Sequence, residues 1–350
     1  MLDKAKFPRD KVCGDAIGGR VKHVLNYINP QYTKRLEVFP STNISSSWSL
    51  HAPNGKSVDL HFVNPGYVSK REDFDNFLLD LVKEKKGTAI LENFKVEKII
   101  QENGLQILIN ESGERLSCKL LIGCDGAHSV VAKSLSNFKV DLKNYSAAVR
   151  AYYKNVGGIP NPHCIEIHLL KDFLPGYFWI FPLPDNVCNV GFGMLSDDVR
   201  KRRINLKLSL NDIIQNSPSL SGRFRDAEII SPLEGFGLPL GGANKSISGT
   251  QFMLCGDAAS LIDPLNGEGI GNAMWSGCLA AKQAESCFEL DDFSAQFMSS
   301  YDNAVYSKLG KELKSKLFMQ KAFNRNWLIN MLINLAVANP RIKNWFAKRL

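Results

Sequence analysis

The stretch Phe252-Met253-Leu254-Cys255-Gly256-Asp257-Ala258-Ala259, with Pro264-Leu265-Asn266-Gly267-Glu268-Gly269-Ile270 shortly after it, decides the fold of this chain. The apolar residues predict a short strand that delivers Gly256 and Asp257 to its carboxyl end, where open α/β sheets bind ligands. Gly267 and Gly269 let the backbone approach a ligand, and a helix expected from about Ile270 directs its free N–H groups there. An acid suits ribose hydroxyls, and a helix N-terminus suits an electron-rich ring. The stretch therefore predicts a dinucleotide-cofactor site; an ordinary strand–loop–helix is the alternative.

The composition is that of a globular, intracellular protein. The chain has 350 residues, enough for one large or two ordinary domains, and 44% of them are hydrophobic. Its eight cysteines form no Cys-x-x-Cys pair and no metal-ligand spacing, so we expect reduced thiols, no metal and a cytoplasmic location. No signal peptide follows Met1, and no uncharged stretch is long enough to span a bilayer.

The positive charge is concentrated in the C-terminal segment. The net charge is +8, and residues 308–350 contain ten basic residues and one acid, or +9, which leaves −1 for the rest. We therefore expect no nucleic-acid partner. Because the segment also contains Trp327, Trp345 and Phe346 beside aliphatic residues, it predicts peripheral contact with an anionic membrane face. A helix packed on the body with a solvated basic face is the alternative.

The order of the expected elements indicates two interleaved units. Strands are expected within 47–62 around a Pro53-Asn54-Gly55 turn, and an amphipathic helix over 71–86. A second strand ends in an acid–glycine pair at Asp125-Gly126, before a helix from about Ser129. The predicted domains are a cofactor domain (1–40, 67–144 and 251–290), an antiparallel-sheet domain (41–66 and 145–250) and a basic helical segment (291–350).

Four stretches carry a family resemblance. They are Phe7-Pro8-Arg9-Asp10-Lys11-Val12-Cys13-Gly14-Asp15, Cys124-Asp125-Gly126-Ala127-His128-Ser129, Tyr177-Phe178-Trp179-Ile180-Phe181-Pro182, and Cys255 to Ile270. Together they resemble the geranylgeranyl reductase family of flavoproteins, within the FAD-dependent group typified by p-hydroxybenzoate hydroxylase. The resemblance implies a mixed α/β fold, in which an incomplete Rossmann-like FAD-binding domain is interleaved with an antiparallel-sheet substrate domain and followed by C-terminal helices.

The resemblance also implies roles for particular residues. FAD is the expected cofactor, with NAD(P)H or another reductant as electron donor. The expected cofactor-binding residues are Asp3, Arg9, Lys11, Cys13, Gly14, Arg71, Asp125, Gly126, Gly256, Asp257, Pro264, Gly267, Glu268, Gly269 and Ile270. Tyr177, Trp179 and Phe181 alternate along one strand and are expected to line the cavity for an apolar, prenyl-like substrate. No catalytic residue is assigned, although Cys13 is a candidate.

Ordinary structural roles stand beside several of these assignments. Asp257 and Asp125 could cap helices, because Asp is a favoured N-cap residue. Arg9 and Lys11 could be solvated, and Arg71 could pair with Asp73 or Asp75. The aromatic strand could be plain core. His128, His163 and His168 are expected to be structural, since none has an evident Cys, Ser or carboxylate partner by spacing.

One departure from the family concerns the start of the chain. No Gly-x-Gly-x-x-Gly follows a strand, although that motif brings backbone against the FAD pyrophosphate. Met1-Leu2-Asp3-Lys4 resembles the end of the family's second strand, with Asp3 at the ribose-binding acid. The chain as written is therefore expected to lack the opening βαβ elements and to bind FAD weakly or not at all.

The expected activity is FAD-dependent reduction of carbon–carbon double bonds in a prenyl or other apolar substrate. A flavin monooxygenase or halogenase of the same superfamily is the alternative enzyme. A non-catalytic lipid-binding or membrane-associated protein is the alternative of another class. The sequence does not specify the substrate or the oligomeric state.

Overall fold

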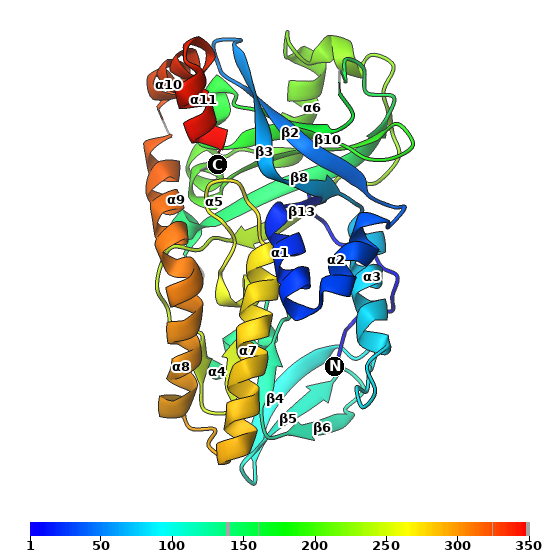
Figure 1. Ribbon diagram of the computed structural model, residues 1–350, viewed down its shortest axis with the longest axis vertical. Helices are drawn as coiled ribbons and strands as arrows, with labels where there is room; N and C mark the ends of the chain where they lie inside the picture. Colours follow the sequence, from blue (N-terminus) through cyan, green and yellow to red (C-terminus); the bar gives the residue numbers. More distant parts are fainter. Residues whose placement is uncertain (138–140, 160, 324, 348–350) are drawn as a thin grey trace. The chain divides into compact units, whose positions relative to one another are not determined.

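The computed structural model describes residues 1–137, 141–159, 161–323 and 325–347 (Figure 1). The chain divides into two compact units, each assembled from separate stretches. The first unit contains Met1–Arg9, Asp75–Asp141 and Leu238–Leu317; the second contains Asp10–Phe74, Leu142–Gly237 and Phe318–Leu350. Helices and strands are mixed in both, so the predicted mixed α/β class is confirmed.

The first unit is built around a small parallel pair of strands. β7 (Leu121–Gly123) pairs in parallel with β15 (Phe252–Leu254), and β14 (Ser248–Gly249) pairs antiparallel with β15. A separate antiparallel sheet contains β4 (Val96–Glu102), β5 (Leu105–Asn110) and β6 (Arg115–Cys118).

Helices complete the core of this unit. α7 (Ile270–Leu290) and α8 (Ala295–Val305) run side by side in Figure 1, and α4 (Val130–Leu135) follows β7. The core joins Val131, Met253, Leu254 and Tyr301. The strand and helix expected on either side of Asp257 are therefore both present.

The second unit contains a nine-stranded sheet. Its order is β1-β3-β2-β9-β10-β11-β8-β12, with β13 also paired to β8. The strands are β1 (Ala16–Ile17), β2 (Asn43–His51), β3 (Ser57–Val68), β8 (Tyr145–Lys154), β9 (Cys164–His168), β10 (Tyr177–Pro182), β11 (Val187–Leu195), β12 (Glu228–Ile229) and β13 (Glu234–Pro239). β2 and β3 form the predicted hairpin, with Gly55 at φ +82° in the turn.

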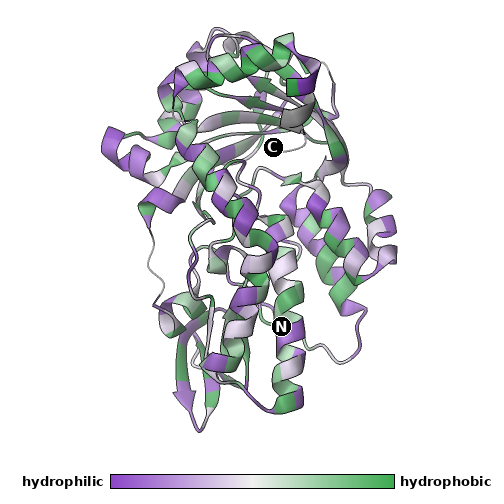
Figure 2. Ribbon diagram, turned by 60° about the vertical axis from the view of Figure 1, so that its left-hand side comes forward, coloured by the Kyte–Doolittle hydropathy of each residue, from purple (hydrophilic) through white to green (hydrophobic). Residues whose placement is uncertain are grey.

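Alternation along the strands gives this sheet two buried faces. Trp179 and Phe181 of β10 pack with Ile165 of β9 in one cluster. Phe178 and Ile180 belong to the cluster on the opposite face. Figure 2 shows hydrophobic and hydrophilic residues next to one another along many of the helices, as expected of elements with one buried side.

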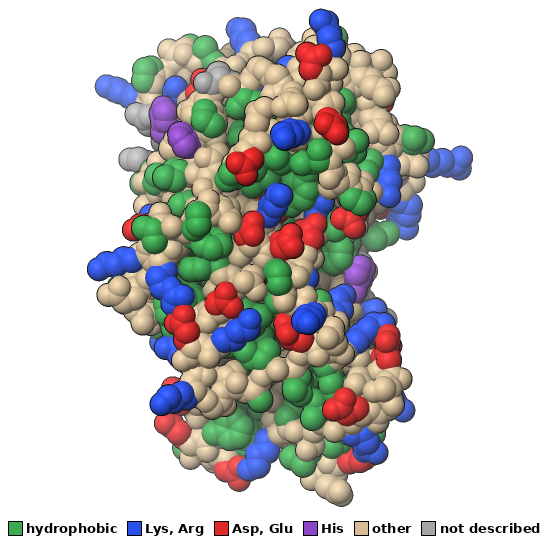
Figure 3. Space-filling view, turned by 90° about the vertical axis from the view of Figure 1, so that its right-hand side faces the viewer, with side chains coloured by type: hydrophobic (Ala, Val, Ile, Leu, Met, Phe, Trp, Pro, Cys, Tyr) green, Lys and Arg blue, Asp and Glu red, His purple; other side chains and the backbone are tan. Residues whose placement is uncertain are grey.

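The remaining helices are distributed over the two units. They are α1 (Gly19–Ile28), α2 (Pro30–Glu37), α3 (Arg71–Lys83), α5 (Ser196–Arg202), α6 (Leu206–Asn216), α9 (Lys311–Ala322), α10 (Asn326–Ala338) and α11 (Pro340–Ala347). In the part of the chain that the structure describes, no helix has both the length and the apolar composition needed to cross a bilayer. On the face drawn in Figure 3, acidic and basic side chains are interspersed.

Candidate functional site

Two acidic turns end neighbouring parallel strands in the first unit. Leu254 of β15 lies beside Gly123 of β7. The next residues are Cys124-Asp125-Gly126 after β7 and Cys255-Gly256-Asp257 after β15. Because the carboxyl ends of parallel strands meet at one edge of a sheet, both predicted acid–glycine motifs lie at the edge where α/β folds bind ligands.

The Asp257 carboxylate faces the glycine turn before α7. A Cβ built on Gly269 would lie 3.4 Å from Oδ1 of Asp257. Gly256 has φ +56° and Gly267 has φ +75°, a backbone region that favours glycine. A Cβ on Gly256 would also lie 2.8 Å from the Cβ of Ala273 in α7. The structure therefore brings together Asp257 and the predicted turn, and it requires glycine at position 256.

The start of α7 offers backbone N–H groups at the same turn. Gly269 is its N-cap, no side chain in the described part of the chain caps the helix, and its first turn contains no acidic residue. Such a helix end favours an anionic or electron-rich acceptor. An acid, a glycine turn and an uncapped helix of 21 residues fit the hydroxyls and the ring edge of a flavin cofactor.

A buried acid that the sequence analysis missed organises this turn. Oδ1 of Asp263 accepts the backbone N–H groups of Leu265 (2.9 Å) and Asn266 (3.4 Å), and Oδ2 accepts Nζ of Lys316 in α9 (2.6 Å). The backbone N–H of Asp263 also donates to the carbonyl of Glu268 (2.8 Å). The Asp-Pro-x-Asn-Gly sequence is typical of such a side-chain-closed turn and could have indicated this role.

Asp125 is engaged in capping α4. Its Oδ2 accepts the backbone N–H groups of Val130 (2.6 Å) and Val131 (3.2 Å), while Ser129 caps the N–H of Ala132 (2.8 Å). Gly126 adopts φ +77° in the intervening turn. The geometry is that of the helix-capping alternative, and a cofactor contact of Asp125 stays a prediction.

The N-terminal candidates of the first unit have local partners. Asp3 accepts the backbone N–H of Ala5 (2.8 Å), and its neighbour Leu2 forms a parallel bridge with Leu91. Arg9 donates to Asp75 at 2.6 Å. A solvated Arg9 is therefore not what the structure shows, and its pairing with a cofactor phosphate stays a prediction.

In the second unit, the Cys13–Gly14 segment packs on the predicted substrate strand. A Cβ on Gly14 would lie 3.3 Å from the ring of Phe181 and 3.5 Å from Nε1 of Trp179. Trp179, Phe181 and the half-buried Tyr177 share one face of β10. The structure thus groups two predicted cofactor residues with the three predicted substrate residues. Lys11 precedes them in the same segment, and Arg71 begins α3.

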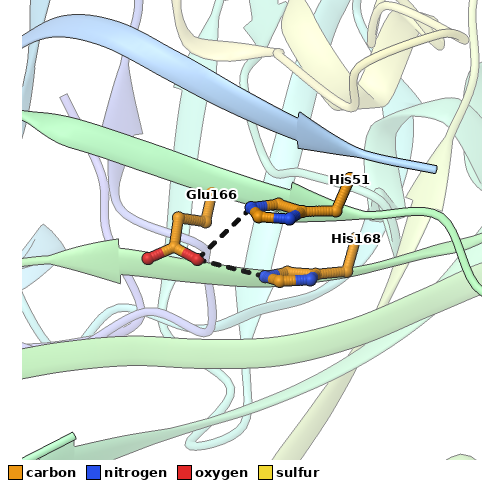
Figure 4. A group of neighbouring side chains, drawn as sticks. All are labelled: His51, Glu166 and His168. Carbon is orange, nitrogen blue, oxygen red and sulfur yellow. Dashed lines mark hydrogen bonds and ion pairs between the residues drawn. The ribbon is translucent and has the colours of Figure 1, made fainter. Parts of the chain in front are cut away.

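The opposite face of the sheet carries a histidine–glutamate cluster (Figure 4). Oε2 of Glu166 lies 3.2 Å from Nε2 of His168 and 3.6 Å from Nε2 of His51. The two imidazole rings are stacked, with centroids 4.1 Å apart and planes 8° from parallel. Arg223 donates to both oxygens of Glu166, at 2.6 and 2.7 Å.

This cluster has metal-ligating residue types, but its geometry is that of an ion-pair network. An imidazole binds a metal along a lone pair in its ring plane, and two nearly parallel rings direct their lone pairs side by side rather than toward one point. Arg223 also occupies both Glu166 oxygens. Burial, then electrostatic interaction with His168, lowers the pKa of His51 to about 4.

The expectation that His168 has no carboxylate partner by spacing is wrong. Glu166 precedes it by two residues in β9, and alternate residues of a strand share a face. The spacing was therefore a usable signal. His163 contacts the carbonyl of Ile44 through Nδ1 (3.0 Å), which is a structural interaction.

Comparison with known proteins gives consistent matches. Residues 68–282, more than half of the chain, match the family model of the FAD binding domain. The chain is 31% identical over 282 residues to digeranylgeranylglycerophospholipid reductase of Methanococcus vannielii, covering 78% of this chain and 70% of that protein. It is 29% identical over 300 residues to menaquinone reductase of Mycobacterium tuberculosis, covering 82% and 70%.

Two solved structures show the same fold. A geranylgeranyl bacteriochlorophyll reductase-like protein from Thermoplasma acidophilum has a TM-score of 0.82 at 23% identity, covering 96% of this chain and 84% of that chain. The halogenase PltM in complex with phloroglucinol and FAD has a TM-score of 0.77 at 17% identity, covering 96% and 74%.

Proposed function

The chain belongs to the geranylgeranyl reductase family of FAD-binding oxidoreductases, and we propose that it reduces carbon–carbon double bonds in a prenyl or other long apolar substrate. The observation that carries this proposal is its 31% identity to digeranylgeranylglycerophospholipid reductase over more than three-quarters of the chain. NAD(P)H or another reductant is proposed as the electron donor. Membership of this enzyme family sets aside the non-catalytic alternative.

The residues of the first unit would hold the cofactor. FAD would supply hydride chemistry, and this chain would bind and orient it. Asp257 would accept hydroxyl groups of the cofactor, while the Gly267–Ile270 backbone and the start of α7 would donate to the ring edge. Asp263 would keep the turn in place through its bonds to Leu265 and Lys316.

The aromatic face of the second unit would bind the substrate. Trp179 and Phe181 are buried in a cluster of apolar side chains, with Tyr177 partly buried against it. Such a surface suits a hydrocarbon chain and offers few groups that would need to be desolvated. Cys13, in the segment packed on Trp179 and Phe181, remains a candidate for a catalytic contact.

The test is product analysis with chemically reduced enzyme. The protein is incubated with excess FAD and dithionite under anaerobic conditions, and then with a lipid that carries geranylgeranyl chains. We expect a mass gain of two hydrogens for each bond reduced. A gain of one oxygen when air is admitted would instead indicate a monooxygenase, the alternative that the halogenase fold similarity favours. Separate addition of NADH and NADPH tests the donor.

A matched pair of variants tests the cofactor role of Asp257. Asp257→Asn should raise the Kd for FAD, measured at equilibrium by the change in flavin fluorescence on titration, because an amide is a poorer acceptor for hydroxyl donors. Asp212→Asn, in the exposed part of α6, is the control. Equal Kd values of the two variants for FAD would remove Asp257 from the site.

We also propose that α10 contacts an anionic membrane surface. Ile329, Ile333 and Ala336 pack in the aromatic-face cluster of the second unit. Trp327, Met331 and Leu335 repeat every four residues, which places them on one side of the helix, and they are 61%, 41% and 43% exposed. One face of α10 is thus packed on the body, as the alternative expects, and another is exposed, as the proposed membrane contact requires.

The positive charge of the C-terminal segment supports an anionic membrane as the partner of α10. Residues 308–350 carry +9, and an exposed tryptophan among basic residues is typical of membrane-surface helices. The side chains of Trp345 and Phe346, which contributed to the prediction, lie outside the described residues. The protein would then be cytoplasmic and peripheral on the membrane.

Liposome sedimentation tests the contact. Replacing Trp327, Met331 and Leu335 by Ser should reduce binding to vesicles containing phosphatidylserine. The matched control replaces Val63, Leu208 and Ile229, which are exposed apolar residues elsewhere in the same unit. Equal sedimentation of the two triple variants, or equal binding to neutral vesicles, would contradict the proposal.

A further inference from the structure

A buried carboxyl group lies beneath the aromatic face of the second unit. Asp15 has no exposed surface and sits at φ +66°, directly after the Cys13–Gly14 segment. Its Oδ2 accepts hydrogen bonds from the hydroxyl of Tyr152 (2.7 Å) and from Nδ2 of Asn189 (2.9 Å). Its Oδ1 is buried and has no hydrogen-bond partner among the residues that the structure describes. A buried acid whose direct hydrogen-bond partners are uncharged is unusual and calls for an explanation.

Asn189 connects this carboxyl group to the predicted substrate strand. Tyr152 and Asn189 are register partners on β8 and β11, so both side chains reach Asp15 from one face. Nδ2 of Asn189 also donates to the carbonyl of Cys13 (2.7 Å), and its Oδ1 accepts Nε1 of Trp179 (2.9 Å). Since both ends of the amide are engaged, Asp15 helps to fix which end faces the indole.

The space around the indole is closed on its other side. Trp179 is the register partner of Gly191 on β11. A Cβ on Gly191 would lie 2.1 Å from Cζ2 of the indole. The ring therefore occupies the volume that a side chain at position 191 would fill, and its N–H is held by Asn189. Trp179 has one orientation as long as that hydrogen bond is kept.

Several charged groups face Asp15. Arg150 of β8 and Arg71 of α3 act on it electrostatically. Arg150 itself pairs with Asp10 at 2.5 Å and with Glu234 at 3.6 Å. The ring of Tyr152 has Arg150 at 4.6 Å and Lys70 at 5.3 Å from its centroid. Burial raises the pKa of Asp15 to about 6, although its two hydrogen bonds and the arginines oppose that rise.

We propose that Asp15 is a positioning residue for the apolar substrate, which fixes the Trp179 indole through Asn189 when it is ionised and releases it when it is protonated. The inference rests on the proposed function, because it takes the face bearing Trp179 as the substrate surface. The physical reason is that a hydrogen bond to a carboxylate is about twice as strong as one to a neutral group. Protonation of Asp15 therefore weakens the bond that orients Asn189.

The first experiment needs neither cofactor nor substrate. The chain contains five tryptophans, so the Trp179 signal is the fluorescence of the wild type minus that of Trp179→Phe. We expect this difference to change with pH, with a midpoint near 6. Asp15→Asn should show the acid-form signal at every pH, Asp15→Glu should restore a transition, and Asp212→Asn, an exposed control, should leave the transition unchanged. An unaltered transition in Asp15→Asn would overturn the proposal.

A second variant tests whether the transition could disappear simply because the protein is unfolded. Asn189→Leu removes the link but keeps Asp15, so near-UV circular dichroism should still report a folded protein while the Trp179 transition disappears. If the transition persists in Asn189→Leu, the connection through the amide is refuted. Because the Asn189 amide forms hydrogen bonds with Trp179, Cys13 and Asp15, this variant tests the connection between Asp15 and Trp179 most directly.

Steady-state kinetics separates this inference from the proposed function. With chemically reduced enzyme, Asp15→Asn should raise KM for the prenyl lipid about five- to tenfold, the size expected for one hydrogen bond, and leave kcat nearly unchanged. In the wild type the same rise in KM should appear below pH 6. No reduction by the wild type would refute the proposed function. Reduction with the same KM and pH profile in both proteins would refute the role of Asp15 alone.

Discussion

Asp15 and Glu166 are buried carboxylates on opposite faces of the nine-stranded sheet, and their pKa values are shifted in opposite directions. Asp15 lies on the face with Trp179, and Glu166 lies on the face with His168 and Phe178. Their exposed fractions are 0% and 4%, so the two acids are almost equally removed from water. Burial alone would raise the pKa of both.

Their partners explain the difference. Glu166 accepts two hydrogen bonds from Arg223 and one from His168, which more than offset burial and lower its pKa to about 2. Asp15 accepts hydrogen bonds from the uncharged groups of Tyr152 and Asn189. These bonds offset the effect of burial only in part, so the pKa of Asp15 rises to about 6. A full positive charge in bidentate contact thus decides which buried acid stays ionised.

The comparison distinguishes the Glu166 face, whose charge is constant, from the Asp15 face, whose charge depends on pH. Glu166 remains charged at any physiological pH, so its cluster holds β2, β9 and the Arg223 segment in one arrangement. Asp15 changes charge near neutral pH, and it does so on the face proposed to bind substrate. A buried acid whose pKa is shifted toward neutrality by its environment is a candidate functional residue.

The largest expected effect comes from breaking the Glu166–Arg223 pair. Arg223→Met leaves a buried carboxylate without its bidentate partner and should lower the free energy of unfolding by about 3–5 kcal/mol. Urea denaturation followed by circular dichroism at pH 7 measures this change. The control is Arg200→Met, because Arg200 is exposed and pairs with Asp197 at the surface, where little should be lost.

A double variant sharpens the same comparison. Glu166→Leu combined with Arg223→Met replaces the ion pair by apolar side chains and should recover most of the lost stability, since the cost lies in the unpaired charge. A single Arg223→Met variant as stable as the wild type would show that Glu166 is not held by Arg223 in solution.

Local sequence patterns predicted the parts of the molecule that are local. The strand before Gly256, the turn at Gly267 and the helix from Ile270 follow one another directly, and each obeys short-range rules for turns and helix ends. Glu166 and His168 were accessible in the same way, because they are two residues apart on one strand. That pairing was missed by considering histidines without strand alternation.

The Asp15 network was not predictable from one sequence. Its partners Tyr152 and Asn189 are 137 and 174 residues away, and they meet only because β8 and β11 are neighbours in the sheet. The motif resemblance drew attention to Cys13 and Gly14 but not to the next residue. Residues 10–40 also pack with the large sheet, whereas the sequence analysis grouped them with the cofactor stretch.

Unfolding measurements at a series of pH values test the sheet face that contains Asp15. In the folded state the pKa of Asp15 is raised from 3.8 to about 6, so between these values the folded state holds a proton that the unfolded state has lost. Asp15 must therefore lower stability as pH rises through this window. Relative to the wild type, Asp15→Asn should gain about 2–3 kcal/mol between pH 4 and pH 7.

Glu166 supplies the internal contrast for that series. The pKa of its carboxyl group is lowered to about 2, so its contribution is present above pH 4.5 and is lost only as the pH falls toward 2. Glu166→Gln should therefore change stability by a constant amount between pH 5 and pH 7. A flat difference for Asp15→Asn as well would mean that the two acids do not differ as their partners indicate.

The smallest expected effect concerns the space that Trp179 occupies. Gly191→Ala would place a methyl group 2.1 Å from Cζ2 of the indole, so the ring must leave its position beside Asn189. Overpacking of this kind typically costs about 1–3 kcal/mol. Gly222→Ala is the matched control, because a Cβ there meets nothing within 4 Å. Urea denaturation measures both variants.

The displaced indole should also lose the pH-dependent fluorescence assigned to Asp15, while the Glu166 face, which Gly191→Ala does not touch, should keep its stability contribution. If Gly191→Ala retains that fluorescence transition, Trp179 responds to Asp15 without the Asn189 hydrogen bond. The two faces would then differ in the charge of their buried acids, but the hydrogen-bonded connection from Asp15 through Asn189 to Trp179 would be refuted.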